Sequence, residues 1–252
     1  FRNDVEHGCP TDCGTCDDHE QHTCLPIVEV TDHCNLECPI CIVDNHDSKH
    51  MEPATFAKIV DGLVEAEGAC ESLALSGGEP TSHPQILELL RIATSRSEIG
   101  RVVLITNGIR LGKDRELARA IKDMGVYVGL QLDGFTADVH LKIRGKDLVK
   151  EKTAALAILA ELDIPTQLIF VATKGVNDHQ IGQVVELFLS APHFLSLNFQ
   201  PVAYTGHGGG NFGHDPNDRL TIPGVIKRID EQTNGKVKYQ DFFPLPCSHP
   251  QC

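Results

Sequence analysis

From residue 25 onward the sequence alternates short apolar runs with longer amphipathic segments, and this alternation limits the possible folds more than any other feature. The apolar runs are rich in Val, Ile and Leu, as in Val102-Val-Leu-Ile105, and they lack the polar–apolar alternation of a half-exposed strand. Such runs predict strands of a parallel sheet that is buried on both faces. We predict strands at 25–31, 72–76, 102–106, 126–132, 166–172 and 194–200, and helices at 53–67, 83–96, 113–124, 147–162, 178–190 and 222–233.

This order of strands and helices predicts an α/β fold whose parallel strands are joined by right-handed crossovers. Both an open doubly wound sheet and a partial barrel are compatible with it. In either fold, ligands bind at the carboxyl ends of the strands. Polar or glycine-containing turns fall at these ends, which predicts one shared site: a cysteine-rich loop after the first strand, then Gly77-Gly78, Asn107-Gly108, Asp133-Gly134 and Lys174-Gly175.

Composition excludes several classes of protein. The net charge of −13 argues against a nucleic-acid-binding surface and against electrostatic attachment to anionic lipids. No apolar run approaches the length of a membrane span, and no segment reads as a signal peptide. The chain starts at Phe1 rather than Met, so we expect a piece of a longer protein.

Of the ten cysteines, nine crowd into 9–41 and 247–252, and Cys70 stands alone between these ranges. Their short spacings favour metal binding over disulfides, and we therefore expect a cytoplasmic, oxygen-poor setting. The central group is Cys34-x3-Cys38-x2-Cys41, directly after the first strand. Three thiolates on one loop can hold three corners of a cubic iron–sulfur cluster, which leaves the fourth iron open to a small molecule. A structural zinc site or a plain electron-transfer cluster are the alternatives.

The cysteine triplet, together with Ser76-Gly-Gly-Glu-Pro80 after the second strand, resembles the radical S-adenosylmethionine (SAM) superfamily over roughly residues 25–203. The resemblance implies a partial (β/α)6 TIM-like barrel with a [4Fe–4S] cluster on Cys34, Cys38 and Cys41 and SAM at its open iron. It also implies that the reduced cluster cleaves SAM to methionine and a 5'-deoxyadenosyl radical, which abstracts a hydrogen atom.

Further SAM contacts follow from this resemblance. Gly77, Gly78, Glu79 and Pro80 would bind the amino group, because glycines allow close approach and Glu79 adds negative charge. Arg144 suits the carboxylate, although a surface ion pair is the simpler interpretation. The other candidates lie at later strand ends: Thr106 and Asn107, then Gln131 and Asp133 for the ribose hydroxyls, then Val171 and Asn198 beside the adenine.

The two ends of the chain carry further cysteines. Cys9, Cys13 and Cys16 repeat the central spacing, and Cys24 offers a fourth thiolate. Four thiolates predict a closed accessory [4Fe–4S] cluster, with zinc as the alternative. Cys247 and Cys252 look like part of a further cluster site. We therefore divide the chain into a cysteine-rich segment at 1–24, the barrel at 25–203, and a loop, helix and cysteine-containing tail at 204–252.

The cysteine pattern at both ends, with Glu29-Val-Thr31 before the triplet, is similar to archaeal tetraether-lipid synthases and the related methanogen pterin methylases. This similarity implies either radical C–C coupling of lipid alkyl chains or methylation of a pterin. The motifs do not choose between them; we expect lipid coupling, with substrate access from a membrane surface, and pterin methylation as the alternative. A reductant such as ferredoxin or flavodoxin is implied. The alternative outside the class of enzymes is an iron–sulfur electron-transfer protein without SAM chemistry.

Overall fold

The computed structural model describes residues 23, 25–43, 48–206, 212 and 215–243. Within them, one sheet of six parallel strands runs in the order β1-β2-β3-β4-β5-β6. The strands lie within a residue or two of the predicted ranges: β1 Ile27–Thr31, β2 Leu73–Gly77, β3 Val102–Thr106, β4 Tyr127–Gln131, β5 Thr166–Ala172 and β6 Phe194–Pro201. Consecutive strand order is that of a barrel, because a doubly wound sheet reverses its order at a switch point.

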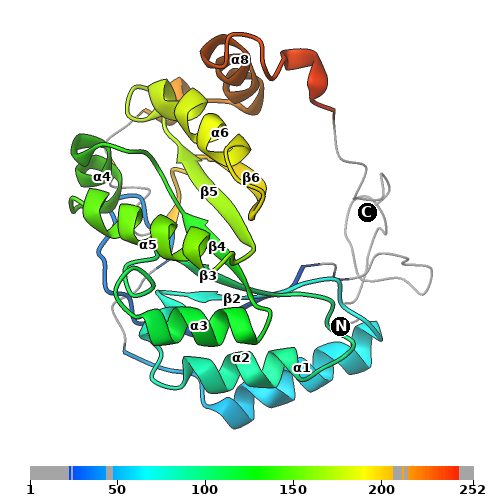
Figure 1. The fold of residues 1–252 in the computed structure, drawn as a ribbon. Coiled ribbons are helices and arrows are strands. Elements are labelled where there is room, and N and C mark those ends of the chain that lie inside the picture. The colour runs from blue at the N-terminus through cyan, green and yellow to red at the C-terminus, as the bar shows by residue number, and fades with distance from the viewer. Residues whose placement is uncertain (1–22, 24, 44–47, 207–211, 213–214, 244–252) are drawn as a thin grey trace, which may run out of the picture.

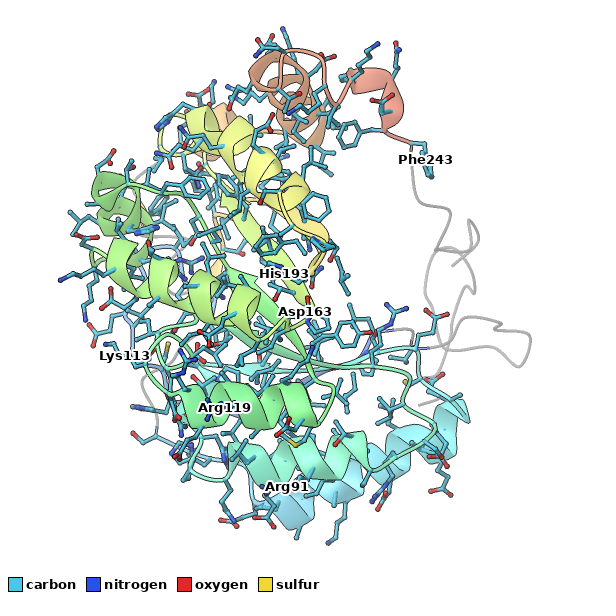
Figure 2. The ribbon with its side chains drawn as sticks, in the orientation of Figure 1. Arg91, Lys113, Arg119, Asp163, His193 and Phe243 are labelled. Atoms are coloured by element: carbon cyan, nitrogen blue, oxygen red, sulfur yellow. The ribbon has the colours of Figure 1, made fainter. Side chains whose placement is uncertain are left out.

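The described helices lie outside the curved sheet, as Figure 1 shows, so none of them covers its concave inner face. The fold is therefore an α/β partial TIM-like barrel. The helices are α1 Pro53–Glu67, α2 Ile86–Thr94, α3 Arg115–Asp123, α4 Ala137–Arg144, α5 Val149–Glu161, α6 Ile181–Leu189 and α8 Ile222–Gln232. Charged residues such as Arg91 of α2 and Arg119 of α3 point to solvent (Figure 2).

Helix α4 was missed in the sequence because it has only eight residues and a weak apolar stripe. It ends at Gly145, which adopts the left-handed conformation (φ 74°) that commonly caps a helix. Val139 and Ile143 of α4 pack with Ile40 of the cysteine loop in a small apolar cluster at the carboxyl ends of the strands. This packing joins α4 to the loop that carries the three central cysteines.

The main core lies between the sheet and the helices. Every second residue of a strand faces outward into it, among them Val30, Leu75, Leu104, Leu130 and Phe170. The inner face of the sheet is less buried than we predicted, since we expected the strands to be buried on both faces. On the edge strands β1 and β6 the inward residues Glu29 and Gln200 are exposed, because none of the described helices packs on that side.

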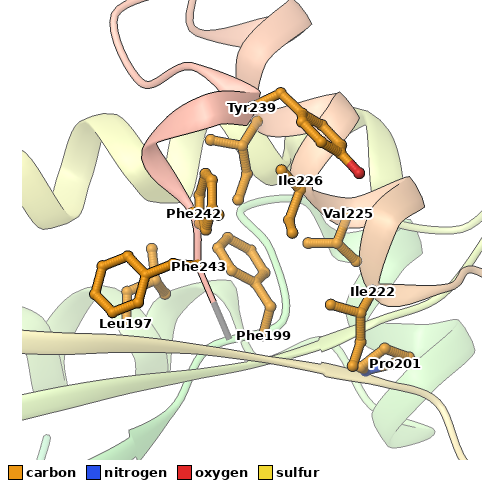
Figure 3. Close-up of a pocket in the computed structure, with 10 residues that line it drawn as sticks. Leu197, Phe199, Pro201, Ile222, Val225, Ile226, Tyr239, Phe242 and Phe243 are labelled. Atoms are coloured by element: carbon orange, nitrogen blue, oxygen red, sulfur yellow. The ribbon is translucent and has the colours of Figure 1, made fainter. Parts of the chain in front are cut away.

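The last described segment packs on the outer face of β6. Here α8 and the 3-10 turn Tyr239–Asp241 border an apolar groove (Figure 3). Its walls are Leu197, Phe199 and Pro201 from β6, Ile222, Val225, Ile226 and Ile229 from α8, and Tyr239, Phe242 and Phe243. None of the helices in the described chain is long and apolar enough to cross a membrane. The proposed division at residues 24 and 203 stays a prediction.

Candidate functional site

The cysteine loop follows β1 and crosses the carboxyl ends of the neighbouring strands. The turn after β2 holds it through two backbone hydrogen bonds: Gly78 N donates to Thr31 O at 2.7 Å, and Glu79 N donates to His33 O at 2.8 Å. The Asn107 side chain, after β3, donates to Asn35 Oδ1 at 2.7 Å. The glycine-rich turn therefore has a structural role that the sequence did not reveal, which is to position the cysteine loop.

Gly78 allows this close approach, and we expect Gly78→Ala to disrupt it. A Cβ at this position would lie 2.3 Å from His33 O and 2.6 Å from His33 C. Backbone atoms of the cysteine loop would have to move, so the free energy of unfolding should fall by about 1–3 kcal/mol. Iron bound per chain after anaerobic reconstitution should fall as well.

The matched control is Gly62→Ala in α1, where an added Cβ meets no atom within 4 Å. Because alanine favours helices by up to about 1 kcal/mol over glycine, this variant should be as stable as the parent or more so. Equal iron content and stability in the Gly78 and Gly62 variants would contradict the positioning role.

The three central thiols lie half-buried along one cavity. Burial raises the pKa of Cys34 to about 11 and also raises the pKa of Cys38, where the nearby Arg144 guanidinium opposes the shift. Within the described residues, no three Cys, His, Asp or Glu side chains converge as ligands of a single metal ion. All three thiols line the same cavity, and in a cluster each of them would bind a different iron.

Glu79 is buried, and its carboxylate accepts hydrogen bonds from four donors. Oε1 accepts from Thr81 N at 3.1 Å, Thr81 Oγ1 at 2.5 Å and Thr106 Oγ1 at 2.6 Å, while Oε2 accepts from Asn107 N at 2.8 Å. The carboxylate therefore ties the end of β2 to the end of β3. Its negative charge still lies on the cavity wall, but its hydrogen-bonding capacity is largely used within the protein.

Asp133 and Arg144 form a buried ion pair beside the cysteines. Arg144 Nε donates to Asp133 Oδ2 at 2.6 Å and Nη1 approaches Cys38 Sγ at 3.8 Å, while Val171 N donates to Asp133 Oδ1 at 3.1 Å. Although burial alone would raise the pKa of Asp133, the guanidinium holds it below its usual value. Arg144 Nη2 is buried without a partner among the described residues, and Arg144 lines the cavity.

Two expectations are corrected here. Arg144 is 7% exposed, so it is not the surface ion pair that was the simpler interpretation. Asp133 is completely buried and does not line the cavity, so its carboxylate is not placed to bond ribose hydroxyls. The Asp133 carboxylate is bonded to Arg144 instead. Its position at the end of a strand had suggested a ligand contact, because the sequence does not show that the arginine is its partner.

Lys152 of α5 is a site residue that the sequence analysis missed. Its Nζ lies below the cavity and donates to Asn107 O at 2.7 Å and Gln131 O at 2.5 Å, so it ties the ends of β3 and β4 together. Burial lowers the pKa of Lys152 to about 8, although Asp133 opposes the shift. The sequence held one signal for this role: Lys152 shares the apolar face of its helix with Leu148, Ala155 and Leu159, where a lysine is unusual.

The other candidates divide by position. Pro80 and Thr106 are buried behind the cavity wall, and Asn198 is exposed on β6 outside it. Cys9, Cys13, Cys16, Cys24, Cys247 and Cys252 lie outside the described residues, so both accessory sites remain predictions. The cavity brings together Cys34, Cys38, Cys41, Gly77, Gly78, Glu79, Asn107, Gln131, Arg144 and Val171.

Comparison with known proteins agrees with this geometry. A match to the Radical SAM superfamily covers residues 28–188, more than half of the chain. The chain belongs to the radical SAM superfamily. This is an enzyme superfamily, and the matched region includes both the cysteine loop and the glycine-rich turn.

Two curated relatives extend over much of this radical SAM chain. A 7,8-dihydro-6-hydroxymethylpterin dimethyltransferase of Methanocaldococcus jannaschii is 32% identical over an alignment of 252 positions, which covers 98% of this chain and 49% of that protein. A GTP 3',8-cyclase of Chlorobaculum tepidum is 29% identical over 175 residues, 68% of this chain and 51% of the relative. The chain thus spans about half the length of either relative.

Solved structures confirm the fold of the barrel. Streptococcus suis SuiB bound to S-adenosylmethionine superposes with a TM-score of 0.65 at 15% identity, over 84% of this chain and 47% of SuiB. Native anSMEcpe with bound AdoMet and Cp18Cys peptide gives a TM-score of 0.62 at 21% identity, over 85% of this chain and 62% of that one. At these identities the similarity concerns the fold alone.

Proposed function

We propose that this chain is the catalytic barrel of a radical SAM enzyme that methylates a pterin. The observation that carries the proposal is the cavity itself. It brings together the three thiols of one loop, the glycine-rich turn and Arg144, whose Nη2 is buried without a partner among the described residues. These groups match the parts of SAM and of a cluster with one open iron.

Cys34, Cys38 and Cys41 are the residues that would hold a [4Fe–4S] cluster. When bound and reduced, the cluster supplies the electron for cleavage of SAM and so the radical for hydrogen abstraction. The protein's own task is to bind and orient SAM. Arg144 Nη2 is suited to a carboxylate, because a buried donor without a partner costs free energy until a ligand satisfies it.

Further residues complete the SAM site. Gln131 and Asn107 line the cavity at the ends of β4 and β3, and Lys152 holds the backbone of both. The Gln131 side-chain amide can bond the ribose or the methionine amino group, whereas the Asn107 amide already bonds Asn35 and Ile109. The apolar Val171 and Ile169 of β5 offer a surface for the adenine ring.

The pterin assignment replaces our expectation of lipid coupling. The 32% identical relative is named for its action on a dihydropterin, and it spans nearly the whole of this chain. The cysteine motifs are common to both reactions and do not choose between them, so the preference for pterin methylation comes from this relative. Pterin methylation, the alternative in the sequence analysis, has the better support. Cytoplasmic location and a ferredoxin or flavodoxin donor remain part of the proposal.

The decisive test is anaerobic reconstitution of the chain with iron and sulfide, followed by SAM, dithionite and 6-hydroxymethyl-7,8-dihydropterin. We expect 5'-deoxyadenosine and, by mass spectrometry, a pterin that carries one or two added methyl groups. Formation of 5'-deoxyadenosine without a methylated pterin would leave radical SAM chemistry standing and reject the substrate. No 5'-deoxyadenosine from a protein with intact clusters would favour the electron-transfer alternative.

A further inference from the structure

The inner face of the partial barrel carries polar side chains that SAM and the cluster do not account for. Glu29 of β1 faces inward, because its neighbours Val28 and Val30 pack into the core on the outer side. It pairs in register with Ser76 of β2, which also lines the cavity. Gln200 of β6 lines it from the opposite edge of the sheet.

Two carboxylates line the cavity, and they differ in the number of hydrogen bonds that they accept from the protein. Glu79 accepts four hydrogen bonds from its own protein. Glu29 accepts none and forms no ion pair within the described part of the chain, and its side chain is exposed to the cavity. The cationic side chain on the cavity wall, Arg144, is already engaged by Asp133. Glu29 is therefore the cavity carboxylate that is available to a ligand.

We propose that Glu29 recognises the pterin ring by accepting hydrogen bonds from N3–H and the 2-amino group. These two donors lie side by side on one edge of the heterocycle. The two oxygens of a carboxylate match such a pair, in the same parallel geometry in which they accept from a guanidinium. This inference rests on the proposed function, since it assigns a residue to that substrate.

The surroundings of Glu29 suit a flat heterocycle. Ile27 of the same strand is inward and 56% exposed, and Ile169 of β5 lines the cavity as well. Apolar side chains next to a small number of polar groups are typical of small-molecule sites, where the polar groups fix orientation. The cavity that contains Glu29 continues to the cysteine loop, so a ring held here shares the space with SAM.

The test compares binding of 6-hydroxymethyl-7,8-dihydropterin and of SAM to the reconstituted chain and to its Glu29→Gln variant by calorimetry. Loss of a charge-assisted pair of hydrogen bonds should raise the Kd for the pterin about 10–100-fold. The Kd for SAM should stay within about twofold. Glu71→Gln is the matched control, since Glu71 is exposed before β2, at the other end of the sheet, and should change neither Kd.

A second ligand shows whether Glu29 recognises the 2-amino group or whether the substitution simply weakens binding of any similar ring. 7,8-Dihydrolumazine has a carbonyl in place of the 2-amino group, so it presents an acceptor to Glu29 and should bind the parent protein more weakly than the pterin does. An amide at position 29 can donate to that carbonyl. The preference for the pterin over the lumazine should therefore shrink by at least about tenfold in Glu29→Gln.

Four results would overturn the assignment. An unchanged Kd for the pterin, or an unchanged preference for the pterin, would show that Glu29 does not read this edge. An equal rise in the Kd for SAM would make Glu29 a SAM contact instead. If the parent protein binds no dihydropterin at all, the proposed substrate fails and the role of Glu29 fails with it; if only the variant comparison fails, the substrate stands.

Discussion

Replacement of Cys38 by alanine should lower the rate of 5'-deoxyadenosine formation more than about 100-fold. Its Sγ lies in the cavity beside Arg144, and its loss leaves one iron of the proposed cluster without a protein ligand. Changes to groups outside the ligand shell typically cost 10–100-fold, so loss of a ligand should cost more. Iron content, the absorbance of the reconstituted cluster and 5'-deoxyadenosine yield measure the effect.

Cys70→Ala is the control for the loss of a thiol. Cys70 is buried in the core next to the start of β2, at the end of the sheet away from the cavity. This variant should keep the parent's iron content and product yield, with only a modest loss of stability. A Cys38→Ala protein that retains a SAM-responsive cluster would refute the assignment. So would loss of SAM binding in Cys13→Ala, because that would move the SAM-binding cluster to the N-terminal cysteines.

Asp133→Ala should reduce the free energy of unfolding by about 3–5 kcal/mol, because it leaves the buried Arg144 without its anion. Lys152, buried nearby, loses a favourable charge as well. Urea unfolding of the metal-free, reduced protein measures the change. The control is Asp61→Ala, which removes the exposed partner of Arg96 and should cost less than about 1 kcal/mol. Equal costs for the two variants would mean that the buried pair contributes no more than a surface pair.

The same pair has a pH signature. The pKa of Asp133 is lower in the folded protein than in the unfolded chain, so the unfolded chain binds the proton first as pH falls. The stability from this carboxylate is therefore complete above the unfolded pKa, near 4, and is lost as pH falls further. Asp133→Asn should unfold with a shallower pH dependence below about pH 4 than the parent.

Much of the fold was predictable because it depends on local patterns. Runs such as Val102-Val-Leu-Ile105 must be buried, and six of them separated by helices limit the topology to a few parallel arrangements. Helix α4 was not predictable, because eight residues with a weak apolar face depend on tertiary packing against Ile40. Pattern analysis detects long periodic segments and misses such short ones.

The residues around the site were harder to assign than the fold. Asp133 and Arg144 stand at positions that suit ligand contacts, but in the structure the aspartate serves the arginine. Lys152 was missed because its partners are backbone carbonyls of two strands, at Asn107 and Gln131, which no spacing in the sequence indicates. Each of these roles depends on which groups share a small buried volume.

By itself, the sequence determined the positions of the six strands, the cysteine loop and the turn that accompanies it, because adjacent residues and their hydrophobic pattern specify them. The order of the strands in the sheet came from the structure, because it depends on which strands pair. Only the tertiary structure decided which polar groups face the cavity and which form hydrogen bonds or ion pairs with other groups of the protein. Because a buried polar or charged group costs free energy without a partner, Glu79, Asp133 and Lys152 pair with groups from distant segments. Among the described residues, Arg144 Nη2 stays buried without a partner, and Glu29 faces the cavity without one.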